Sequence, residues 1–140
     1  MKITICGSMT FAGKMSEAKK ELEKQGHVVF VPCDIEKHLE NPALVDNFAE
    51  DLPHMIANDV IRDHFDLIEK SDAIVVLNYP KNGCDGYVGA STLMEMGVAY
   101  YLHKKIFTLF DIPASDKARW AHEVSAMQPV VLAGDLGKIK

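Results

Sequence analysis

The chain has 140 residues and 48% of them are hydrophobic, which suits one buried core and is too short for two ordinary domains, so residues 1–140 are interpreted as a single domain. A formal net charge of -5, with lysines dispersed among acids, argues against a nucleic acid polymer as partner. No apolar stretch approaches the roughly 20 residues that span a bilayer, and no signal-peptide pattern follows Met1, so we expect no membrane partner and a cytoplasmic location.

Short apolar segments rich in β-branched residues alternate along the chain with helical patterns. The strands are expected at 2–8, 27–33, 72–80, 104–110 and 129–135. The helices are expected at 16–26, about 58–70, 91–103 and 115–127. Near-continuous apolar strands separated by helices predict an α/β fold with a parallel sheet covered on both faces. Five strands in a chain of this size favour a flavodoxin-like or Rossmann-like three-layer sandwich with strand order 2-1-3-4-5.

Residues 34–58 interrupt this alternation, because they are too many for a simple connection. Asn41-Pro42 fits a helix N-cap followed by proline at the first helical position. We therefore expect a short additional helix there and an irregular joint near Pro53.

Two glycine-rich loops follow the first and third predicted strands, "GSMTFAGK" and "NYPKNGCDGYVGAST". In the predicted order these loops flank the point where the strand order reverses, which is where open α/β sheets bind their ligands. The candidate substrate-binding residues in these loops are Gly7, Ser8, Met9, Asn78, Gly86, Tyr87, Gly89 and Ser91.

The first loop does not match the known phosphate-binding fingerprints. In a Walker loop Gly7 and Gly13 would be one residue closer together, and Met15 would be a hydroxyl residue. The G-x-G-x-x-G dinucleotide pattern is also missing. What remains is a Gly-Ser turn before a helix, which suits a single anion, and the alternative is that Gly7 simply permits a tight exit from the strand.

Glu95 and His64 are the candidate catalytic residues. Glu95 is predicted in the first turn of a helix beginning at about Thr92, where an ionised carboxylate is favoured and can act as a nucleophile. Thr92-x-x-Glu95 is equally a capping box, in which the glutamate only bonds to the backbone. His64 falls on the apolar stripe of its helix, so it is either a core histidine bonded to a backbone carbonyl or a protonatable group in the site.

Three segments carry a family resemblance over the whole chain: "CGSM", "SDAIVVL" and "GASTLMEMGVAYYLHKKIFTLF". With them the chain resembles the nucleoside 2-deoxyribosyltransferase superfamily, which includes the 2'-deoxynucleoside 5'-monophosphate N-glycosidases. The resemblance implies that Glu95 attacks the anomeric carbon of a small-molecule nucleoside or nucleotide and that Gly7-Ser8 holds its 5'-phosphate. It also implies a homo-oligomer in which an adjacent subunit completes the pocket, and a reaction that needs no metal or organic cofactor.

The chain departs from this family at two aspartates that usually accompany the glutamate. Gly89 occupies one of these positions and His64 the other. The sequence therefore predicts cleavage or transfer of an N-glycosidic bond, and the alternative is a non-catalytic module that binds or senses nucleotides on the same fold.

The three cysteines and the histidines other than His64 are expected to play no part in the chemistry. Cys6, Cys33 and Cys84 are widely spaced, without a C-x-x-C pair, and are expected to be reduced thiols. The histidines outside position 64 show no metal-ligand spacing, so no metal site is predicted. They are His27, His38, His54, His103 and His122.

Overall fold

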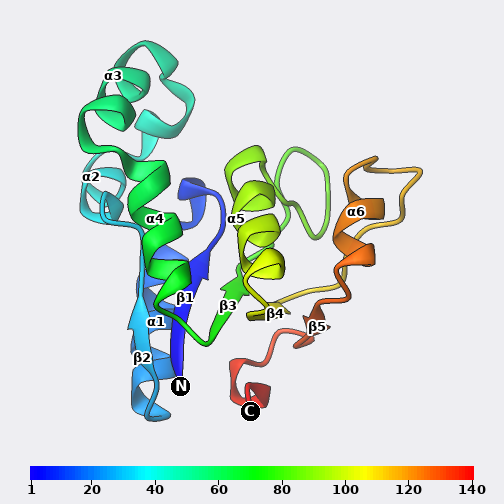
Figure 1. Cartoon of the computed structure of the whole chain (residues 1–140). Coiled ribbons are helices and arrows are strands. Elements are labelled where there is room, and N and C mark those ends of the chain that lie inside the picture. Colours follow the sequence, from blue (N-terminus) through cyan, green and yellow to red (C-terminus); the bar gives the residue numbers. More distant parts are fainter.

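A computed structural model describes residues 1–140 and contains one five-stranded parallel sheet of order β2-β1-β3-β4-β5 (Figure 1). The strands are β1 (Lys2–Cys6), β2 (Val28–Phe30), β3 (Ala73–Val76), β4 (Lys105–Thr108) and β5 (Val130–Val131). The predicted α/β class, the parallel arrangement and the strand order are confirmed. The strands are shorter than the predicted apolar segments, because the sheet ends where the backbone leaves each strand and turns toward the next helix.

Helices cover both faces of the sheet, which gives three layers. Helix α1 (Ala12–Lys24) packs on one face, and α4 (Val60–Glu69), α5 (Ala90–Tyr101) and α6 (Ala121–Ala126) pack on the other. Along β1 the side chains alternate between these faces, as they must in a strand. Ile3 and Ile5 therefore join the core beneath α1, while Cys6 joins the core beneath α4 and α5.

The carboxyl ends of β1 and β3 lie side by side, with Cys6 paired to Val76. The two glycine-rich loops leave the sheet from this edge, as the strand order predicts. Figure 1 shows α3 (Phe48–Asn58) beyond this edge, at the end of the molecule opposite to both termini.

Residues 34–58 are more helical than expected. They form α2 (Ile35–Glu40), the 3-10 helix η2 (Pro42–Asp46) and α3. The predicted short helix at Asn41-Pro42 is confirmed by η2, but the predicted joint at Pro53 is wrong, since Pro53 lies inside α3. The chain breaks instead at Asp59, whose left-handed backbone (φ 45°) ends α3 and starts α4.

The predicted helix at 115–127 is also shorter, because α6 begins only at Ala121 and the preceding residues form turns. The other three predicted helices, at 16–26, 58–70 and 91–103, correspond to α1, α4 and α5. Two further 3-10 helices are η1 (Met9–Phe11) and η3 (Leu136–Lys138). None of the helices combines the length and the apolar composition needed to cross a membrane.

Candidate active site

A cavity of about 320 Å³ opens at the carboxyl end of β1. Its walls come from the loop after β1, from the segment 32–55, from α4 and from the start of α5. The cavity thus lies beside the reversal of strand order, where the sequence predicts ligand binding, and its volume is at the lower end of the range for small-molecule sites.

His64 and Glu95 meet on the wall of this cavity. The imidazole Nδ1 of His64 lies 2.7 Å from Oε1 of Glu95, and its Nε2 lies 3.2 Å from the backbone oxygen of Ile5. Both side chains are buried, with 6% of His64 and 7% of Glu95 exposed. A carbonyl oxygen can only accept, so Nε2 carries a hydrogen and donates it to Ile5. The predicted inward orientation of His64 is confirmed, and its ring contacts both a backbone carbonyl and the carboxylate of Glu95.

The charge of Glu95 decides the protonation of His64. Burial by itself lowers the pKa of His64, but the hydrogen bond to Glu95 and the charge of that carboxylate outweigh burial, with the Ile5 carbonyl adding to them. The net pKa of His64 is raised above 6.5. An imidazolium donating from both nitrogens fits the two contacts and holds Oε1 in place.

Glu95 has a second carboxylate oxygen, Oε2, that is buried and has no hydrogen-bond partner. The capping-box alternative for this glutamate is wrong, because α5 begins at Ala90 with Gly89 as its N-cap and no side chain caps it. Glu95 is therefore the sixth residue of α5 and lies in its second turn. It lies beyond the first four residues, whose backbone N–H groups a cap would satisfy. The carboxylate is held on one oxygen and free on the other.

Cys6 lies beneath the pair at the end of β1. Its thiol, a ring nitrogen of His64 and a carboxylate oxygen of Glu95 all lie within 4.8 Å of one another. Complete burial, together with the charge of Glu95, raises the pKa of the Cys6 thiol well above its usual value. All three cysteines are free, as expected.

The Gly-Ser loop after β1 forms the neighbouring part of the wall. Gly7 has φ +154°, and a Cβ there would lie 3.2 Å from the backbone oxygen of Leu77, so the tight exit from the strand does require glycine. Ser8 caps η1, with its Oγ accepting from the backbone N–H of Thr10 at 3.3 Å. The same Oγ also accepts from Nζ of Lys81, on the second glycine-rich loop, at 3.1 Å. The two loops thus bring the Lys81 ammonium group, the Ser8 hydroxyl and the start of η1 together.

Eight of the ten residues proposed from the sequence line the cavity. They are Gly7, Ser8, Met9, His64, Tyr87, Gly89, Ser91 and Glu95. Asn78 does not line it, because it is fully buried and its amide exchanges two hydrogen bonds with the backbone of Phe110, at 2.9 and 2.8 Å. Gly86 does not line it either, and its backbone packs against Asp111.

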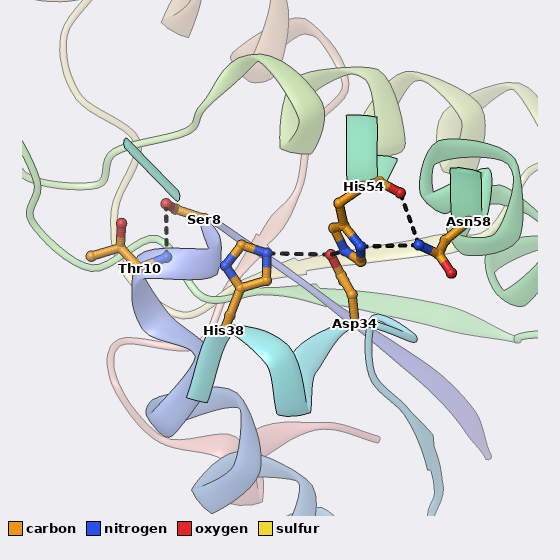
Figure 2. A network of polar contacts seen from close by, with 6 residues as sticks. All are labelled: Ser8, Thr10, Asp34, His38, His54 and Asn58. Atoms are coloured by element: carbon orange, nitrogen blue, oxygen red, sulfur yellow. Dashed lines mark hydrogen bonds and ion pairs between the residues drawn. The ribbon is translucent and has the colours of Figure 1, made fainter. Parts of the chain in front are cut away.

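Segment 32–55 contributes a polar cluster that the sequence did not reveal (Figure 2). Nε2 of His38 and Nε2 of His54 each lie 3.2 Å from the same carboxylate oxygen of Asp34. The amide of Asn58 donates to Nδ1 of His54 at 3.0 Å, so the other nitrogen of His54 donates to Asp34. Asp34, His38 and Asp51 line the cavity, and buried atoms of two of them, Nδ1 of His38 and Oδ1 of Asp51, have no partner.

The spacing Asp34-x-x-x-His38 places both residues on one helical face, and this was the available signal. A search of the sequence for metal-ligand spacing does not find this pair. Sequence spacing does not identify Lys81 and Cys6 either, because they approach the site from other elements.

No protein-family model matches the sequence, and no curated protein matches it. Among solved structures, the chain is similar to the Clostridium botulinum CMP N-glycosidase BcmB, with a TM-score of 0.48 and 16% sequence identity. The match covers 94% of this chain and 85% of that one. The two sequences differ at most positions, so this likeness does not establish a shared chemistry.

Proposed function

We propose that this protein cleaves the N-glycosidic bond of a small nucleotide, preferably a nucleoside 5'-monophosphate, with Glu95 as the nucleophile. The observation that carries the proposal is the asymmetric carboxylate of Glu95, a residue of the cavity wall, which is fixed through Oε1 by His64 while its buried Oε2 has no hydrogen-bond partner. A carboxylate nucleophile needs both properties, because a fixed position lowers the entropic barrier and a free lone pair forms the new bond.

The reaction follows the two-step course of a retaining glycosidase. Oε2 of Glu95 attacks C1' of the sugar while the bond from C1' to the base nitrogen breaks, and its electron pair leaves with the base. Water then attacks C1', the bond to Glu95 breaks, and the carboxylate is restored. The hydroxyl of that water stays on the sugar and its proton goes to the departed base, so the products are the free base and a sugar phosphate.

His64 acts on Glu95 and is assigned here as a positioning residue. It stands at one of the two positions where the resembling family has aspartate. A donor at this place orients the carboxylate, whereas a second carboxylate would repel it. The changed residue therefore remains compatible with a glutamate nucleophile.

The phosphate end of the substrate is assigned to the Gly7-Ser8 loop. Lys81 supports this assignment, since its ammonium group lies against Ser8 Oγ and can be shared with a phosphate oxygen. The start of helix α5 is another polar part of the cavity wall, which Gly89 and Ser91 line. Positive charge and free N–H groups at a helix start are the usual means of holding a phosphate.

The test is release of free base, measured by chromatography after incubation with nucleosides and their 5'-monophosphates. Glu95→Gln keeps the size of the side chain but removes the nucleophile, and we expect base release to fall at least about a thousandfold. Glu69→Gln is the matched control, since Glu69 is exposed at the end of α4 and lies outside the cavity. It should release base at the wild-type rate.

Two outcomes would contradict the proposal. If Glu95→Gln retains the turnover of the wild type, then Glu95 is not the nucleophile. If the wild type releases no base from any substrate but is stabilised against heat by 5'-monophosphates, then the protein is a non-catalytic nucleotide-binding module.

A further inference from the structure

Three side chains with metal-ligating atoms converge from three elements next to the cavity, where two of them, His64 and Glu95, line its wall. Cys6 comes from the end of β1, His64 from α4 and Glu95 from α5, and their ligating atoms lie within 4.8 Å of one another. All three are buried. We propose that Cys6, His64 and Glu95 form a site for a zinc ion.

The chemistry of the donors selects the class of metal. A thiolate, an imidazole nitrogen and a carboxylate oxygen are each ordinary zinc ligands, and zinc is bound tetrahedrally. Three protein ligands would leave a fourth position for water or another ligand, and two of the three residues, His64 and Glu95, line the cavity. Magnesium and calcium prefer oxygen ligands, so the sulfur and nitrogen donors disfavour them.

Two contacts prepare the ligands for a metal. The backbone oxygen of Ile5 accepts from Nε2 of His64, so in the neutral imidazole the lone pair is on Nδ1, which points at Glu95. A hydrogen bond of this kind is the usual outer partner of a metal-bound histidine. The buried Oε2 of Glu95 has no partner in the protein and is available as a ligand.

The distances require only a small adjustment. Bonds of 2.0–2.3 Å place tetrahedral zinc ligands roughly 3.5 Å apart, so the ligand atoms would shift by about 1 Å through side-chain rotation. The proton shared by His64 and Glu95 and the proton of the Cys6 thiol leave when zinc binds. The ion then carries two positive charges against the thiolate and the carboxylate, so the buried site is neutral.

The metal site does not depend on the proposed glycosidase activity, although the two use the same carboxylate. Zinc bound to Glu95 would occupy the oxygen lone pair that attacks C1'. The zinc-loaded protein would then be inactive in base release, and a chelator would restore the activity. Metal binding and catalysis are therefore measured separately.

The test is a titration of the chelator-treated, reduced full-length chain with Co²⁺, which replaces zinc and reports its ligands by absorbance. We expect one equivalent of Co²⁺ to bind, with the visible bands of a tetrahedral ion and a thiolate-to-cobalt charge-transfer band. Zn²⁺ should displace it. Since no nucleotide is present, this readout is unaffected by whether the protein releases base.

The variants identify the ligands. Cys6→Ser should abolish the charge-transfer band and weaken Co²⁺ binding at least about tenfold, while Cys33→Ser and Cys84→Ser should leave both unchanged. Glu95→Gln has nearly the same shape as the wild-type residue and should also weaken binding about tenfold, with circular dichroism confirming that the variant is folded. If Cys6→Ser does not fold, Co²⁺ binding to Glu95→Gln tests the proposed metal site in its place.

Two results would overturn the proposal. One is the absence of tetrahedral cobalt bands in the wild type at a Co²⁺ excess. The other is a charge-transfer band that survives Cys6→Ser or disappears in Cys84→Ser, because either would place the sulfur ligand elsewhere.

Discussion

Lys81 adds a cation to the loop that we assign to the substrate phosphate, where its Nζ donates to Ser8 Oγ at 3.1 Å. Lys81→Met removes the charge and keeps a long side chain. We expect the KM of a 5'-monophosphate to rise about tenfold, equivalent to roughly 1.4 kcal/mol, because a charge-assisted hydrogen bond to the phosphate is lost. The KM of the corresponding nucleoside should hardly change. Steady-state kinetics with both substrates provide the measurement.

Lys14→Met is the matched control for this comparison. Lys14 is an exposed lysine of α1 that pairs with Glu17 and, unlike Lys81, makes no hydrogen bond to Ser8. Its replacement should leave both KM values unchanged. If Lys81→Met weakens nucleotide and nucleoside equally, the cation does not contact the phosphate and the assignment of the loop is wrong.

Single residues of the site could be proposed from the sequence, but their contacts could not. Glu95 was proposed from its place near the start of a predicted helix and from the family resemblance, and His64 from a family aspartate position that falls on an apolar helical stripe. Their 2.7 Å contact joins residues 31 positions apart, and no local pattern encodes such a distance. Lys81 was overlooked for the same reason, because its partner Ser8 is 73 residues away.

At the scale of elements, the loop between β3 and α5 is held in place by Gly86. Gly86 has φ +71°, and a Cβ there would lie 2.2 Å from the backbone oxygen of Asp111. Gly86→Ala should therefore lower the thermal midpoint by at least about 5 °C, because it adds a backbone clash to the strain of a left-handed alanine. The loop also carries Tyr87, so base release should fall in parallel.

Gly83 allows the strain of a left-handed alanine to be measured without a backbone clash. It has the same φ of +71°, and no atom lies within 4 Å of the position that a Cβ would occupy there. Gly83→Ala should lower the midpoint by only about 2–4 °C, the effect of roughly 1 kcal/mol of backbone strain. Equal shifts for the two variants would show that the contact between the loop and Asp111 is not rigid.

The elements were predictable where one strong signal dominated. The buried strands β1, β3 and β4 are near-continuous apolar segments between polar residues, and each was found. The start of α5 was misplaced because Thr92 and Glu95 fit a capping box, whereas Gly89 ends the loop and the helix begins at Ala90. Tertiary contacts made that choice, since Thr92 is buried and Glu95 bonds to His64.

At the scale of the whole molecule, the strand order followed from the number and type of the elements, but the wall formed by residues 34–58 did not. A short-helix pattern does not say where the helix packs, and α3 has no fully buried residue that would reveal a core-facing side. The fold could thus be predicted from the apolar pattern. The cavity, in contrast, depends on how the weakly buried residues 34–58 pack over the edge of the sheet.

This arrangement makes α3 the part of the site whose stability depends most on ligand. Three of its large apolar side chains are exposed, Phe48, Leu52 and Ile56, so its local opening should be frequent in the free protein. Asp51 and Met55 nevertheless line the cavity, as does the start of α5. A bound nucleotide would therefore connect α3 to the sheet edge.

Hydrogen exchange measured by mass spectrometry can detect this connection in the Glu95→Gln variant, which should bind nucleotide without cleaving it. At a ligand concentration of 100 times Kd, binding stabilises the closed state by about 2.7 kcal/mol, so amides of α3 should exchange up to about a hundredfold more slowly. The amides at the C-terminal end of α1, around Lys24, are the internal reference, because they exchange by local fraying far from the cavity and their exchange should not change. Unchanged exchange in α3 at saturation, with binding verified by calorimetry, would mean that the nucleotide does not reach this wall.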